Sequence, residues 1–260
     1  GDHALAYFNT GAYEYQRILP VPRSWADKRV AVRFEGIYRD ATVFVNGEVA
    51  AQLPFGYGEL LVRIDDFLQY GADNDIHVEC RSGGDSRWYS GAGIYRDVTL
   101  FVSEPVHVAI DGIRVYSSDS TVLVEATIEN ETTRRCTQSI VIEILDGDDV
   151  IATESRPLTI GAGGRATTRS RLRVPGAPTW TIDDPHLLTC RVHVGDDVAS
   201  TRFGIRTVTA DPERGFQLNG ETIKLRGACI HHDGGVVGAA TFHRAEERRV
   251  EILKAAGFNA

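Results

Sequence analysis

Apolar and polar residues alternate along most of the first 200 or so positions, and a period of two predicts β-strands. Val30, Val32 and Phe34 share one face of such a strand. The charged side chains of Arg33 and Glu35 lie on the other face. The same alternation predicts strands over residues 29–38, 41–45, 60–64, 76–80, 98–102, 121–130, 139–145, 165–174 and 187–194.

Turn and boundary signals divide these strands. Asn46-Gly47 lies between apolar runs and predicts a tight hairpin, because a type I′ turn requires positive φ at both central residues. Pro105 marks a boundary, since proline ends a central strand. About seven short strands in about 100 residues then follow, which is typical of an immunoglobulin-like sandwich.

The pattern changes after Arg206. Asn219-Gly220 is another hairpin signal, and residues 225–230 are expected to extend as a strand. A loop is expected over residues 231–235, because two histidines, an aspartate and two glycines follow one another there.

A helix is expected next, capped by Thr241 and running through Ala256, with Gly257 at its C-terminal cap. Residues 258–260 resemble the start of another strand. Strand, loop, helix and strand together form one β/α unit. Such a unit does not bury both faces of its strand, so we expect more chain after Ala260.

Composition narrows the possible functions. The 36 acidic and 28 basic residues give a net charge of −8, which argues against nucleic acid as the main partner. No run approaches the roughly 18 apolar residues of a membrane helix. The four cysteines form no C-x-x-C pair, so we expect neither a structural metal site nor a cofactor. The chain has no Met, even at position 1, which indicates a piece of a longer protein.

The loop after the expected strand carries candidate chemistry. His231, His232 and Asp233 offer imidazole and carboxylate groups that can hydrogen-bond a polar substrate or transfer protons. A metal site would need further ligands, which the local sequence does not supply. A structural role for His232, and a turn-capping role for Asp233, stay open as alternatives.

A glycine-rich stretch between two expected strands carries Arg87, Trp88 and Tyr89. Aromatic faces stack on sugar rings, and arginine donates hydrogen bonds to hydroxyls. The alternative is that both aromatic residues pack against a neighbouring domain.

A stripe of arginines on one strand is a further candidate binding surface. The expected interpretation is the solvated outer face of an antiparallel strand. The stripe consists of Arg165, Arg169, Arg171 and Arg173.

Several of these segments resemble glycoside hydrolase family 2, the group of β-galactosidases, β-glucuronidases and β-mannosidases. The matching segments run in the family's order along nearly the whole chain. They are residues 32–36 (VRFEG), 43–47 (VFVNG), 56–58 (GYG), 90–98 (SGAGIYRDV), 184–188 (DPHLL), 203–206 (FGIR), 216–220 (FQLNG) and 225–233 (LRGACIHHD). The sequence RGACIHHD within the last of these segments is most similar to that of bacterial β-galactosidase-type members.

The resemblance implies a mainly β fold in three parts. Residues 1–104 would form a jelly-roll, galactose-binding-like sandwich that lacks its first strands. Residues 105–207 would form an immunoglobulin-like β-sandwich. Residues 208–260 would be the first β/α unit of a truncated (β/α)8 TIM barrel.

The resemblance also implies a retaining glycosidase of carbohydrate metabolism that acts on β-galactosides. Such enzymes use two carboxyl groups about 5 Å apart, which in this family are glutamates on later barrel strands. Both are expected beyond Ala260, so no catalytic residue is expected in this chain. Glu246, Glu247 and Glu251 lie on the first barrel helix, on the wrong side of a barrel for catalysis.

Substrate contacts carry over by position. His231 matches a family histidine that contacts the glycone. Arg87 falls near the place where some β-galactosidases have an aspartate that reaches into the pocket, and this departure leaves the role of the loop open. The expected substrate-binding set is His231, Asp233, Arg87, Trp88 and Tyr89. The expected partners are a carbohydrate and a second copy of the chain, without nucleic acid or membrane, in the cytoplasm of a bacterium.

Two other function classes remain. The first is a non-catalytic carbohydrate-binding or scaffolding module. The second is a cell-surface adhesion tandem of sandwiches, against which the β/α unit after Arg206 argues.

Overall fold

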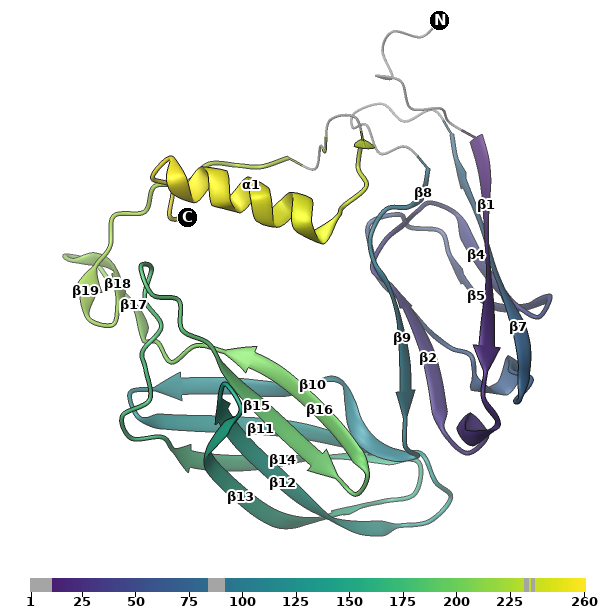
Figure 1. The fold of residues 1–260 in the computed structure, drawn as a ribbon, viewed down its shortest axis with the longest axis horizontal. Helices are drawn as coiled ribbons and strands as arrows, with labels where there is room; N and C mark the ends of the chain where they lie inside the picture. Colours follow the sequence, from purple (N-terminus) through teal and green to yellow (C-terminus); the bar gives the residue numbers. More distant parts are fainter. Residues whose placement is uncertain (1–10, 84–91, 232–233, 235–236) are drawn as a thin grey trace, which may run out of the picture. The chain divides into compact units, whose positions relative to one another are not determined.

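The computed structural model describes residues 11–83, 92–231, 234 and 237–260, and Figure 1 shows its elements. Packing divides the chain into two compact units. Unit 1 comprises Gly1–Val102 and Ala228–Phe258, and unit 2 comprises Ser103–Gly227 with Asn259–Ala260.

Unit 1 contains a four-stranded sheet of order β1-β7-β4-β5, a three-stranded sheet of order β6-β2-β9, and the pair β3-β8. The strands are β1 (Gly11–Val21), β2 (Arg29–Phe34), β3 (Ile37–Tyr38), β4 (Ala41–Val45), β5 (Glu48–Leu53), β6 (Leu60–Arg63), β7 (Ala72–Ser82), β8 (Gly93–Ile94) and β9 (Val98–Ser103). Two 3-10 turns, η2 (Arg23–Trp25) and η3 (Asp65–Phe67), and the helix α1 (His243–Ala255) complete the unit.

The alternation expected in the first strand is confirmed. Val32 and Phe34 of β2 share one buried core with Val43 of β4 and Val78 of β7, so the two larger sheets pack face to face. The expected hairpin is also confirmed, since Asn46 and its following glycine have φ of 52° and 84° and join β4 to β5.

Unit 2 is a second sandwich. Its strands are β10 (Val106–Ser118), β11 (Thr121–Asn130), β12 (Cys136–Asp146), β13 (Asp149–Ile160), β14 (Gly164–Arg173), β15 (Leu188–Val194), β16 (Asp197–Phe203), β17 (Val208–Asp211), β18 (Gly215–Leu218) and β19 (Glu221–Thr222). The sheets β10-β11-β14 and β13-β12-β15-β16 enclose one core, to which Ile128, Ile142 and Val192 contribute fully buried side chains. The third sheet, β17-β18-β19, is small.

The arginine stripe lies on the outer face of β14, as expected. Arg165, Arg169, Arg171 and Arg173 are all exposed, whereas Thr168, Ser170 and Leu172 between them are buried. Glutamates on β11 neutralise part of the stripe, for example Glu125, whose Oε1 accepts a hydrogen bond of 2.7 Å from Arg169. The stripe is therefore a solvated sheet face.

The strand expected over residues 225–230 is wrong, because this segment has no regular secondary structure. A strand needs a continuous ladder of backbone hydrogen bonds, and the described hydrogen bonds to this segment come only from Asn259 and Ala260, more than 30 positions along the chain. The Arg226 N–H donates to the Asn259 side-chain oxygen at 2.7 Å, and the Asn259 N–H donates to the Arg226 carbonyl at 3.0 Å. Residues 258–260 form no strand either, so the described residues provide the helix of the expected β/α unit without its strands.

The expected helix is present but begins later than predicted. Phe242 is the N-cap of α1, and the Thr241 hydroxyl instead donates to the Ala239 carbonyl at 3.3 Å. Gly257 has φ of 91° directly after the C-cap, as its conformational freedom predicts. No residue of α1 is buried, and Val250 is 60% exposed. No helix among the described residues is long and apolar enough to cross a membrane.

Candidate functional site

The structure describes one of the five predicted substrate-binding residues. His231 is exposed and lies in a segment without regular secondary structure. Arg87, Trp88, Tyr89 and Asp233 lie outside the described residues. Their role in substrate binding stays a prediction.

Three of the matching sequence segments meet around Tyr95, where the described chain resumes after the aromatic loop. The Tyr95 hydroxyl donates to the Gly56 carbonyl at 2.9 Å. A Cβ atom on Gly36 would come within 2.4 Å of the Tyr95 ring, so only glycine fits there. Burial raises the pKa of Tyr95 above its ordinary value, which keeps the hydroxyl a hydrogen-bond donor.

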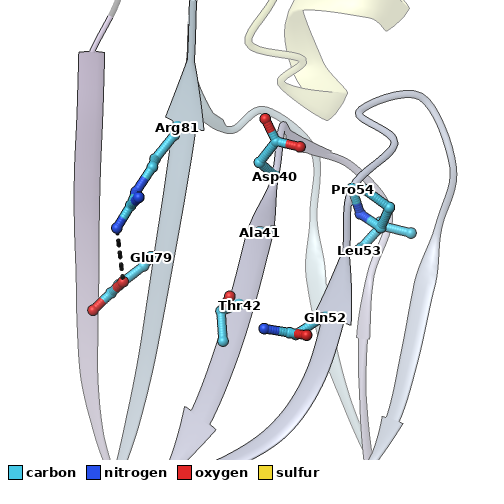
Figure 2. Close-up of a pocket in the computed structure, with 8 residues that line it drawn as sticks. All are labelled: Asp40, Ala41, Thr42, Gln52, Leu53, Pro54, Glu79 and Arg81. Atoms are coloured by element: carbon cyan, nitrogen blue, oxygen red, sulfur yellow. Dashed lines mark ion pairs between the residues drawn. The ribbon is translucent and has the colours of Figure 1, made fainter.

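An open cleft of about 460 Å³ lies on the four-stranded sheet of unit 1 (Figure 2). Register brings its polar residues together, because Thr42 of β4 stands directly opposite both Glu79 of β7 and Gln52 of β5. Their neighbours Val43 and Val78 point into the core, so strand alternation directs this row outward. The cleft is lined by Asp40, Ala41, Thr42, Gln52, Leu53, Pro54, Glu79 and Arg81.

The lining mixes hydrogen-bond donors and acceptors. Arg81 lies 4.0 Å from Glu79 and is 72% exposed, so most of its guanidinium is available to a ligand. The Gln52 amide points toward Thr42 (Figure 2), and Asp40 adds a second carboxylate. A volume of this size is typical of small-molecule sites. A hydroxyl group both donates and accepts hydrogen bonds, and this lining offers partners for both.

Two exposed aromatic residues follow Pro54 closely in the sequence. Phe55 is 60% exposed and Tyr57 is 55% exposed, with ring centroids 5.7 Å apart. Tyr57 also contacts the buried ring of Tyr38 at 5.2 Å, which fixes its position. Exposed aromatic residues at one place on a surface mark binding sites, and their flat faces suit the C–H face of a sugar ring.

Sequence reasoning missed this cleft. Its polar residues come from three strands, and no local motif joins them. The one available signal is the outward position of Thr42, Glu79 and Arg81 in strands whose other face is apolar.

One comparison with known proteins matches a family within unit 2. Residues 108–206 match the family Glycosyl hydrolases family 2. A crystal structure of a glycosyl hydrolase family 2 member from Bacteroides cellulosilyticus superposes with a TM-score of 0.91 at 33% identity. The alignment covers 96% of this chain and 36% of that chain.

Two curated relatives carry different activities in their names. The beta-galactosidase BoGH2A of Bacteroides ovatus is 33% identical over 262 residues, covering 94% of this chain and 30% of the relative. A beta-glucuronidase of Bacteroides fragilis is 27% identical over 281 residues, covering 97% of this chain and 40% of the relative. The chain therefore spans about a third of the length of the curated relatives it matches.

Proposed function

This chain belongs to glycoside hydrolase family 2, and we propose that it is the N-terminal region of a retaining glycosidase that hydrolyses β-galactosides. The observation that carries the proposal is the match along 94% of the chain to a β-galactosidase.

We place the two catalytic glutamates outside this chain. Among the described residues, Glu14 and Glu79 approach the spacing of a retaining pair, since they stand opposite each other on β1 and β7 with ligand oxygens within 4.8 Å. Glu14 is exposed and Glu79 is 39% exposed on the face of a sheet. A general acid needs a pKa raised by an enclosed, water-poor site, which an open sheet face does not supply.

The 260-residue chain alone is therefore expected to release no nitrophenol from nitrophenyl β-galactoside above the buffer rate. Absorbance at several enzyme concentrations measures this. Turnover that rises with protein concentration and disappears in Glu79→Gln would contradict the proposal, and Glu125→Gln, on the outer face of unit 2, is the matched control.

A second candidate function, a carbohydrate-binding module, is favoured by the cleft and by the exposed aromatic pair Phe55 and Tyr57. If the cleft binds sugar, Arg81→Ala removes a charge-assisted hydrogen bond and weakens galactose or lactose binding by about tenfold. Arg171→Ala removes an exposed arginine from unit 2 and is expected to leave sugar binding unchanged. Titration calorimetry shows which of two candidate sites binds the sugar. The Arg81 and Arg171 variants test the cleft, and Trp88→Ala tests the predicted aromatic loop.

The outcomes of this titration decide between the candidate functions. Sub-millimolar binding that is lost in Arg81→Ala supports a sugar subsite in the cleft. The same affinity in Arg81→Ala, with loss in Trp88→Ala, moves the subsite to the aromatic loop. Absence of heat at high sugar concentration excludes the binding-module function and leaves the glycosidase proposal as it stands.

A further inference from the structure

Three side chains with metal-ligand chemistry meet at one edge of unit 2. His107, near the start of β10, stands directly opposite Glu129 on β11. Glu131 follows two positions later, and residues two apart on an extended chain point to the same side. The ligand atoms of all three residues lie within 4.8 Å of one another.

The histidine of this cluster is buried without satisfied hydrogen bonds. Its side chain is 5% exposed, and its Nδ1 atom has no hydrogen-bond partner among the described residues. Its Nε2 atom faces Glu129 Oε2 at 3.6 Å, which is too long for a hydrogen bond. The atom that faces the carboxylates is Nε2 rather than Nδ1, and a cation bound between Nε2 and the carboxylates would supply the contact that no hydrogen bond makes there.

The two glutamates are held in position by other contacts. Arg165 lies 3.2 Å from Glu129 Oε1, which leaves Oε2 directed at His107. The Glu131 N–H donates to the Pro105 carbonyl at 2.9 Å, which fixes the backbone where the carboxylate leaves it. Second contacts of this kind orient ligands in metal sites.

We propose that His107, Glu129 and Glu131 bind a Zn²⁺ ion, with water in the fourth position. Zinc–ligand distances of about 2.0–2.2 Å place the ligand atoms of a tetrahedral site about 3.3–3.6 Å apart, and the observed Nε2–Oε2 separation lies at the upper end of that range. The imidazole nitrogen favours zinc over Ca²⁺ and Mg²⁺, which take oxygen ligands. The site does not depend on the proposed glycosidase function.

Unit 1 supplies an internal control with the same residue types. Glu14, His77 and Glu79 also bring their ligand atoms within 4.8 Å of one another. His77 is 25% exposed and packs edge-on against Phe44 at 5.6 Å, and Glu14 is exposed. Ligands that are mobile and hydrated bind metal more weakly than ligands held by buried neighbours, so the zinc site of higher affinity is expected at His107.

Titration of the untagged, metal-free protein with ZnCl2, followed by calorimetry, tests the proposal. One equivalent of zinc is expected to bind, with affinity at least about tenfold lower in His107→Ala and within about twofold of wild type in His77→Ala. If His107→Ala does not fold, Glu131→Gln, at the partly exposed end of the cluster, provides the same comparison. Zinc affinity that survives in His107→Ala, or that falls in His77→Ala instead, overturns the proposal.

Two further measurements exclude other cations and non-specific binding. Co²⁺ in place of zinc is expected to give the visible absorption of a tetrahedral site in wild type and not in His107→Ala. Zinc is expected to raise the melting temperature of wild type and not that of His107→Ala, because a ligand that binds only the folded state stabilises it. Binding of CaCl2 in preference to zinc, or no binding of either ion, overturns the proposal.

Discussion

Asn130→Ala is expected to lower the free energy of unfolding of unit 2 by about 3–5 kcal/mol, because each buried group left unpaired costs about 1–3 kcal/mol. Asn130 is completely buried at the end of β11. Its amide donates to the carbonyls of Arg134 at 2.8 Å and Gly161 at 2.9 Å. Its side-chain oxygen accepts from the N–H and the hydroxyl of Thr132.

Urea denaturation measured by circular dichroism checks this expectation. Asn219→Gly is the matched control, because the Asn219 side chain also makes two hydrogen bonds but is exposed, and glycine keeps its positive φ. Water can replace those bonds, so a loss of about 1 kcal/mol or less is expected there. Equal losses in the two variants would show that burial does not determine the cost at Asn130.

Ile142→Ala is expected to destabilise the same unit by about 2–5 kcal/mol, the range for large-to-small changes that leave a cavity. Ile142 is completely buried in the centre of β12, between Val192 of β15 and the opposite sheet. Ile151→Ala is the control, since Ile151 on the neighbouring strand β13 is 38% exposed.

The expected loss in the control is about 1 kcal/mol or less, because the exposed side chain buries less apolar area. Denaturation midpoints and slopes of the two variants, measured together, give the comparison. A small loss in Ile142→Ala would mean that the core of unit 2 is not packed as the structure shows.

The sequence predicts strands that bury one face and misses two edge strands that lack a clear apolar face. β11 is predictable because Val122, Val124 and Ile128 alternate with polar residues. β1 and β13 lie at sheet edges, are largely exposed on both faces and each contain a proline, Pro20 and Pro157. Edge strands tolerate proline and need no apolar face, so neither the alternation nor the absence of proline identifies them.

The opposite error occurs near the C-terminal end. Leu225 and Ile230 give residues 225–230 the apolar character of a strand, yet both are more than half exposed. The alternation of apolar and polar residues indicates which face a strand would bury. It does not indicate whether a neighbouring strand is present to form the ladder of backbone hydrogen bonds.

A site whose residues come from different strands cannot be predicted from a local sequence motif. The cleft depends on the register that sets Thr42 opposite Glu79, and the proposed zinc site on the register that sets His107 opposite Glu129. A search for closely spaced ligands therefore predicts no metal site. Register is determined by the packing of whole strands, which a single sequence does not reveal.

Covalent trapping tests the central claim most directly. The claim is that this chain is part of a glycosidase and does not contain the catalytic nucleophile. Retaining enzymes pass through a glycosyl–enzyme intermediate, which a 2-deoxy-2-fluoro-galactosyl fluoride accumulates on the catalytic carboxylate. After incubation of the 260-residue chain with this reagent, intact-mass spectrometry is expected to show the unmodified mass, while a full-length β-galactosidase treated in parallel gains one fluorogalactosyl group. A stoichiometric adduct on any aspartate or glutamate of this chain would contradict the account.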